Sequence, residues 1–96
     1  MTAKTREALG ARIRSLRKAE NLSQKKLALM VGVERSYLAK VEAGKRNPSI
    51  DIIEKIAHGL GVTLSELFAG IDSIPTEDSV KGERPLPSSQ TRRFPA

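Results

Sequence analysis

Apolar residues recur along the first two thirds of the chain with the spacing of α-helices. The N-terminal set stands at positions i, i+4 and i+7, and consists of Leu9, Ile13 and Leu16. This spacing predicts an amphipathic helix over about residues 5–20. Asn21 follows it, and asparagine tolerates the left-handed conformation that ends many helices. A second helix is predicted between the N-cap Ser23 and the stop Gly32, with an apolar face of Leu27, Ala28 and Val31.

Three more helices are predicted after short connections. The third covers residues 34–43, packs through Leu38 and Val41, and stops at Gly44. The fourth begins after Ser49 and stops at Gly61, and we expect its inward face to be Ile50, Ile53, Ile56, Ala57 and Leu60. A T-x-x-E capping box starts a short fifth helix, which reaches about residue 69; its residues are Thr63 and Glu66, flanked by the staple pair Val62 and Leu67. Five short helices with no strand pattern predict a compact all-α domain.

The last 26 residues break this pattern. Residues 71–96 contain four prolines and four serines, and few large apolar residues. Such a composition predicts a mostly disordered tail, so we divide the chain into a folded domain, 1–70, and a tail, 71–96. The basic end at residues 92–94 has two interpretations, a DNA-contacting arm or a plain disordered end, and we favour the second.

The distribution of charge narrows the class of partner. The chain has 17 Lys and Arg against 11 Asp and Glu, a net charge of +6. Residues 1–70 hold 13 basic and 7 acidic residues, whereas the remainder holds four of each. Positive charge concentrated in the folded part favours an anionic partner, with nucleic acid first and a membrane surface second. The apolar stripe of each basic helix is that of a globular core, which argues against a membrane surface.

The sequence lacks the residues needed for disulfides, for metal sites and for membrane-spanning segments. The chain has no cysteine and one histidine, His58, so it has neither a disulfide framework nor a Cys- or His-based metal site. No apolar run approaches 18 residues, and the first 17 residues lack a signal-peptide core. We therefore expect a cytoplasmic protein without a cofactor. Ser36 and Lys40 are spaced like a Ser–Lys catalytic pair, but no third group or oxyanion site accompanies them, so we expect no enzyme.

The third predicted helix also has an outward face. On a helical wheel this face comprises Arg35, Ser36, Ala39 and Lys40, with Tyr37 at its border. Long cationic side chains flank small residues, which lets the helix approach a DNA groove closely while Arg and Lys reach base edges or phosphates. The preceding helix ends in a glycine turn just before it. That order is typical of a helix-turn-helix, whose second helix enters the major groove.

Four motifs follow one another in register between residues 9 and 68. They are L-S-Q-x-x-L-A from Leu22, the pair Gly32-Val33, E-x-G-K-R-x-P-S from Glu42, and L-G-V from Leu60. Together they resemble the helix-turn-helix family of phage Cro and repressor proteins, also called xenobiotic-response-element-like regulators. The resemblance implies a five-helix, lambda-repressor-like domain. It also implies a sequence-specific transcriptional regulator, a repressor or an autoregulatory controller, which binds a two-fold-related operator in double-stranded DNA as a homodimer.

The resemblance assigns roles to matching residues. Base contacts are implied for the outward face of the third helix, from Arg35, Ser36, Tyr37 and Lys40. An R-[ST]-Y opening of this helix is similar to that of members paired with restriction-modification systems. Phosphate contacts are expected from the start of the second helix and from the basic loop behind the third, namely Ser23, Gln24, Lys25, Lys45, Arg46 and Asn47. Arg17 and Glu42 are implied to form an ion pair between the first and third helices.

Two residues depart from the family pattern. Lys26 stands where a glutamate usually completes the capping box of Ser23, so the cap is weaker but a cation is added near the DNA. Glu34 stands where a small N-cap residue is common. It suits the helix dipole but faces phosphates unfavourably, unless it forms an ion pair or accepts a hydrogen bond from a cytosine. The base preference therefore stays open.

Two further questions concern protein partners. Ile52, Leu64, Ile71 and Ile74 have no evident place in the core, so we expect the fifth helix and the start of the tail to form a homodimer interface. An alternative function is a protein-interaction module on the same fold, either an antitoxin or an adaptor, whose tail folds on a partner.

Overall fold

The computed structural model describes residues 1–71, which contain five helices and, within that range, no strand. The helices are α1 (Ala3–Ala19), α2 (Gln24–Val31), α3 (Arg35–Glu42), α4 (Ile50–Leu60) and α5 (Leu64–Leu67). The predicted all-α fold is thus confirmed, although α1 starts earlier than predicted and α5 ends sooner. Residues 72–96 lie outside the described part, and with them the predicted tail, its protein partner, Ile74 and the basic end.

The helix starts follow the side-chain caps expected from the sequence. Ser23 Oγ accepts from the Lys26 backbone N–H at 3.0 Å, and Ser49 Oγ accepts from the N–H three residues on at 3.2 Å. Thr63 and Glu66 form both halves of a capping box, with bonds of 3.0 and 2.8 Å. The early start of α1 has the same cause, because the hydroxyl of Thr2 accepts from a backbone N–H one turn later. Each cap satisfies a helix-end donor that would otherwise lack a partner.

The chain turns sharply between α2 and α3. Gly32 adopts φ 86°, a left-handed conformation that glycine enters without steric cost. Its N–H and that of Val33 both donate to the Ala28 carbonyl, at 2.8 and 3.0 Å. Asn21, between α1 and α2, has φ 57°, as predicted. Because of the turn at Gly32, only three residues connect α2 to α3.

The core is built from aliphatic side chains of all five helices. Its buried members are Leu9, Ile13, Leu27, Ala28, Val31, Leu38, Val41, Ile53, Ile56, Ala57, Leu60 and Leu67. The expectation that Ile50 faces inward is wrong, since this residue is 61% exposed. Ile52 packs against the core instead. Periodicity identifies the apolar face of a helix but not how far the neighbouring helices cover that face. At the first turn of α4 they leave Ile50 exposed.

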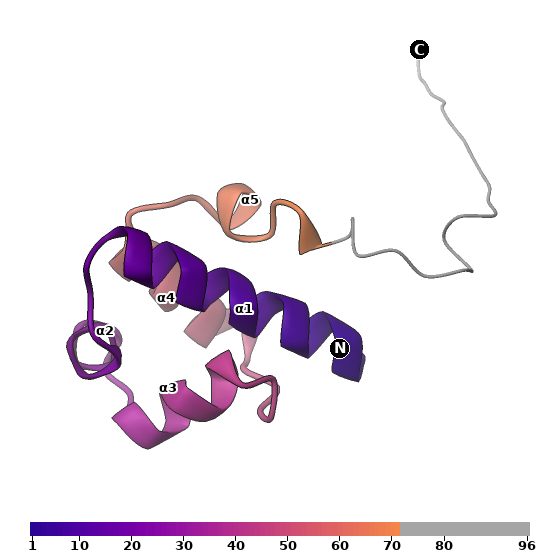
Figure 1. The fold of residues 1–96 in the computed structure, drawn as a ribbon, viewed down its shortest axis with the longest axis horizontal. Coiled ribbons are helices and arrows are strands. Elements are labelled where there is room, and N and C mark those ends of the chain that lie inside the picture. The colour runs from indigo at the N-terminus through magenta and orange to yellow at the C-terminus, as the bar shows by residue number, and fades with distance from the viewer. Residues whose placement is uncertain (72–96) are drawn as a thin grey trace, which may run out of the picture.

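The long helix α1 organises the domain. In Figure 1 it runs across the molecule, with α3 below it, α5 above it and α2 at one end. It packs against α3, α4 and α5, while α2 packs against α3 and α4. The crossing of α1 and α3 is close because of Gly10. A Cβ on Gly10 would lie 2.5 Å from the Val41 carbonyl oxygen and would also overlap that of Glu42.

The residues assigned to a dimer interface are partly accommodated within one chain. Ile52, Leu64 and Ile71 are half-buried and pack against the core, so the premise that they have no inward place is wrong. Helix α5 packs against α1, where Arg12 Nη2 donates to the carbonyl of Glu66 in α5 at 2.8 Å. This long-range contact could not be inferred from local periodicity.

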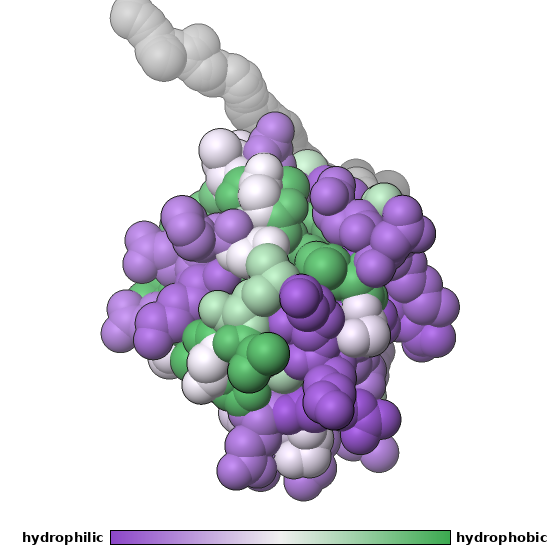
Figure 2. Space-filling model, turned by 90° about the vertical axis from the view of Figure 1, so that its left-hand side faces the viewer, coloured by the Kyte–Doolittle hydropathy of each residue, from purple (hydrophilic) through white to green (hydrophobic). Residues whose placement is uncertain are grey.

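The outer face of α2 carries two exposed hydrophobic residues, Leu29 at 76% and Met30 at 49% exposure. Figure 2 faces the side of the molecule on which α2 lies, and there a hydrophobic patch is surrounded by hydrophilic surface. None of the helices in residues 1–71 is long and apolar enough to cross a membrane.

Candidate nucleic-acid interface

One side of helix α3 packs against the core, and the opposite side is exposed to solvent. Leu38 and Val41 are 0% and 1% exposed, whereas Arg35, Ser36 and Lys40 are all exposed. The two sets match the faces expected from the helical wheel. The helix therefore offers its cationic outward face to solvent while its inner face is part of the core.

A buried ion pair fixes the end of α3. Arg17 Nε donates to Glu42 Oε2 at 2.7 Å and Arg17 Nη2 donates to Glu42 Oε1 at 3.0 Å, a bidentate arrangement. The two side chains are 9% and 3% exposed. Arg17 Nη1 also donates to the Leu22 carbonyl at 2.7 Å. Arg17 thus joins α1, the turn that follows it and α3.

Gln24 connects α2 to the same carboxylate. Its Nε2 donates to Glu42 Oε1 at 3.0 Å, and the residue is half-buried. This hydrogen bond links the start of α2 to the end of α3. Because Ser23 and Lys25 beside it are exposed, the start of α2 presents its polar groups next to α3.

The structure brings most of the predicted contact residues together in two hollows, each lined in part by α3. One is lined by the start of α2, the end of α1 and the first residue of α3, and its residues are Arg14, Arg17, Ser23, Gln24, Lys25 and Arg35. The other is lined by the turn, α3 and the start of α4, and its residues are Gly32, Val33, Glu34, Ser36, Tyr37, Lys40, Arg46 and Ile52. Lys45 and Asn47 lie exposed in the loop behind α3 and line neither hollow.

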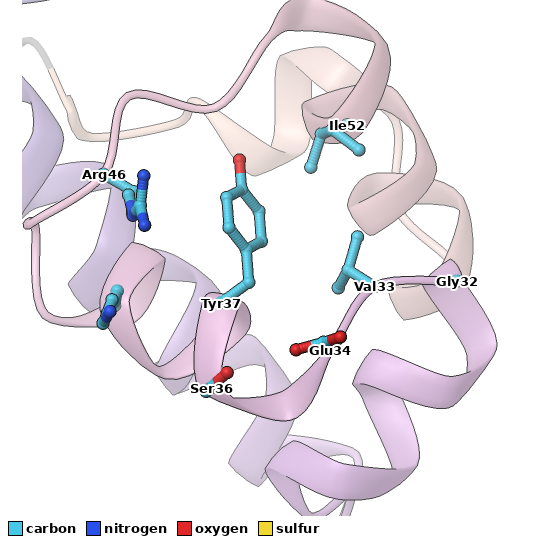
Figure 3. A pocket seen from close by; sticks show the side chains of 8 residues that line it. Gly32, Val33, Glu34, Ser36, Tyr37, Arg46 and Ile52 are labelled. Carbon is cyan, nitrogen blue, oxygen red and sulfur yellow. The ribbon is translucent and has the colours of Figure 1, made fainter.

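Tyr37 occupies the centre of the second hollow. Figure 3 shows its ring between Arg46 on one side and Val33 and Ile52 on the other. The Arg46 guanidinium lies 5.9 Å from the ring centroid, within the range of a cation–π contact. Tyr37 is half-buried against the core, so it links the basic loop to α3 as well as bordering the outward face.

One residue of this surface was missed in the sequence. Arg14 is exposed and lines the first hollow with Lys25 and Arg35. Arg14 stands three residues before Arg17 on α1, and residues at this spacing lie on the same side of a helix. Because Arg17 was already expected to contact α3, the sequence did contain a signal that Arg14 lies near α3.

These elements define a class of protein. A short helix, a left-handed glycine turn and a second helix with a buried inner face and a cationic outer face form a helix-turn-helix unit. The helix-turn-helix family model matches residues 13–67, more than half of the chain. The chain therefore belongs to this family and is a DNA-binding transcriptional regulator.

Among the similar proteins are two control proteins and a biofilm regulator. The chain is 45% identical over 64 residues to the control protein C.MunI of a Mycoplasma species, a match that covers 66% of this chain and 86% of the relative. It is 45% identical to the restriction-modification controller protein C.AhdI from Aeromonas hydrophila, whose crystal structure superposes with a TM-score of 0.63 over 65% of this chain and 94% of that one. It is 38% identical to SinR, a master regulator for biofilm formation whose crystal structure was determined in complex with DNA, with a TM-score of 0.59 over 62% of this chain and 97% of that one.

Proposed function

We propose that the chain is a controller protein of a restriction-modification system that binds a specific operator with α3 in the major groove. The observation that carries this proposal is the outward face of α3, whose exposed Arg35, Ser36 and Lys40 stand on a helix locked in place from behind. The similarity to C.MunI and C.AhdI supports the controller assignment. Such a protein acts in the cytoplasm by binding alone and needs no catalytic group or cofactor.

The exposed side chains on and around α3 fall into base contacts and phosphate contacts. Arg35, Ser36 and Lys40, with Tyr37 at the edge, reach the base edges, because recognition helices contact bases through their N-terminal and outward residues. The surrounding groups hold the sugar-phosphate backbone on both sides of the groove, through Ser23, Gln24, Lys25, Lys45, Arg46 and Asn47. Arg14 joins the phosphate-binding set because it lines the first hollow.

We also propose that two copies of the chain bind the operator together. A two-fold dimer places its recognition helices about 34 Å apart, one duplex turn. A shallow groove between α1 and the turn after α5 offers small and apolar side chains for such an interface, and it is lined by Ala8, Ala11, Arg12, Ala69, Gly70 and Ile71. It lies on the α5 side of α1, whereas α3 packs elsewhere on that helix, so the dimer surface and the DNA surface do not compete.

Selection of bound fragments from random duplex DNA tests the proposal. We expect an enriched sequence with two related half-sites about ten base pairs apart, present near the gene that encodes the chain. The enriched duplex should bind at least about 1000-fold more tightly than a scrambled one at the same salt concentration. Equal affinity for both duplexes, or no enrichment, would refute sequence-specific regulation by this surface.

A further inference from the structure

Glu34 is an anion that has no side-chain partner among residues 1–71, and it is set within a cationic surface. It is exposed and precedes α3 as its N-cap residue, yet its side chain makes no capping hydrogen bond. No ion pair or hydrogen bond of its carboxylate occurs within residues 1–71. The carboxylate is therefore available to a ligand, and it is not needed to hold α3 in place.

Its neighbours are the groups that we propose contact DNA. Glu34 lines the same hollow as Ser36, Lys40 and Arg46, and it directly precedes Arg35 in the chain. Figure 3 shows it at the start of α3, on the rim beside Ser36 and Tyr37. A free carboxylate here repels phosphates, so it weakens binding to DNA of any sequence unless it gains a specific contact.

The major groove offers a carboxylate few acceptable contacts. Guanine presents two acceptors there, thymine an acceptor and a methyl group, and adenine a donor beside the N7 acceptor. Cytosine presents only the N4 amino donor. A carboxylate that enters the groove is thus attracted by cytosine and repelled, at least in part, by the other three bases.

This inference rests on the proposed function. We infer that Glu34 is a specificity-determining residue, which accepts a hydrogen bond from cytosine N4 within one base pair of the base that Arg35 contacts. Glu34 lowers affinity for random DNA by repulsion and recovers the loss only on an operator with cytosine at that position. It therefore increases the ratio between specific and random binding, because repulsion of wrong sequences adds to attraction of the right one.

The test compares the full chain with Glu34→Ala, Glu34→Gln and the control Glu54→Gln. Glu54 is exposed on α4, so its replacement changes the net charge equally without altering the start of α3. Each protein is used to select duplexes from a random pool, and is then titrated against the parent operator, the same operator with the cytosine replaced, and scrambled DNA.

We expect the parent and Glu54→Gln to prefer cytosine at one position in each half-site by about fivefold or more. Glu34→Ala should lose that preference and bind scrambled DNA about two- to fivefold more tightly, since an exposed repulsion is removed. Glu34→Gln should shift the preference towards adenine, whose N6 and N7 match a carboxamide.

Two results overturn the inference in different ways. If the parent selects an operator and both Glu34 variants keep its base preference while binding all duplexes more tightly, Glu34 only repels phosphates and the inference is wrong. If the parent selects no sequence, the proposed function itself fails, and the inference falls with it.

Discussion

Glu42 links the end of α3 to both α1 and α2. Its two carboxylate oxygens accept from Arg17 twice and from Gln24 once, at 2.7 to 3.0 Å. With 3% of its side chain exposed, it has no access to water that could replace these donors. Its removal leaves the Arg17 charge buried with one remaining acceptor, the Leu22 carbonyl.

We predict that Glu42→Ala lowers the free energy of unfolding by about 3–5 kcal/mol, because breaking one half of a buried pair strands the other charge. Gln24→Ala removes only one hydrogen bond and should cost about 1 kcal/mol. Glu54→Ala, at an exposed site on α4, should change stability by less than about 0.5 kcal/mol. Urea denaturation measures all three, and a Glu42→Ala protein as stable as the parent would contradict the assigned role.

Replacements of Arg35 and Lys45 should have different effects, because we propose that Arg35 contacts bases and Lys45 only phosphates. Arg35→Ala should cost about 1–3 kcal/mol on the operator, relax preference at one base pair per half-site, and lose much less on random DNA. Lys45→Ala should weaken binding to both duplexes about equally and reduce the salt slope by about one per lost contact. Titration of both variants on both duplexes at several salt concentrations distinguishes these effects. An equal loss on both duplexes for Arg35→Ala would make Arg35 a phosphate contact instead.

The crossing of α1 and α3 couples helix packing to DNA binding. Gly10 allows the α1 backbone to approach the Val41 and Glu42 carbonyls, and these belong to the same turn of α3 that the buried ion pair holds. Two opposite effects would act on an alanine at this position. Helix propensity favours alanine by at most about 1 kcal/mol, whereas overpacking costs about 1–3 kcal/mol when backbone atoms must move.

We predict that overpacking wins, so that Gly10→Ala lowers stability by about 1–2 kcal/mol and also weakens operator binding through displacement of α3. Gly59→Ala is the matched control on α4. Its Cβ would lie 3.3 Å from Leu27 Cδ1 and 3.5 Å from Val31 Cγ2, the ends of side chains that can shift. We expect that variant to be neutral or up to about 1 kcal/mol more stable. Chemical denaturation and operator titration of both variants provide the measurement, and a Gly10→Ala protein at least as stable as the parent would contradict the prediction.

The two functional surfaces proposed for the molecule lie on different sides of α1. The cationic hollows are each lined in part by α3, and the small-residue groove runs beside the turn after α5. A change in the groove should therefore alter assembly without altering the DNA surface of each subunit. This separation allows dimerisation to be tested by itself.

We predict a homodimer at micromolar concentration, with twice the chain mass of 10.5 kDa in sedimentation. Ala11→Glu places a charge in the groove at an exposed position of α1, and should produce a monomer with the helical content of the parent. Ala3→Glu, exposed on α1 but outside the groove, is the control and should stay dimeric. The monomeric variant should lose most operator affinity while retaining weak binding to a half-site. A parent chain that sediments as a monomer with and without DNA would exclude the dimer.

Local features of the chain were sufficient to predict the elements. The caps Ser23, Ser49 and Thr63 and the turn at Gly32 act on backbone groups only a few residues away, so their effect is visible in the sequence itself. The same holds for the two faces of α3, since a helix places residues by spacing alone. The cationic candidate surface could be predicted for that reason, with Arg35, Ser36 and Lys40 all exposed.

Contacts between distant segments were decided by the tertiary structure. The exposure of Ile50, the close approach at Gly10, the position of Arg14 beside Arg35, and the stacking of Arg46 on Tyr37 all depend on where another helix or loop lies. Periodicity determines which side of a helix is apolar, but burial depends on whether a neighbour covers that side. The sequence by itself determined the five helices and the outward face of α3, because both depend on residues close together in the chain. Only the packing of the helices and loops against one another decided which residues from distant segments are in contact.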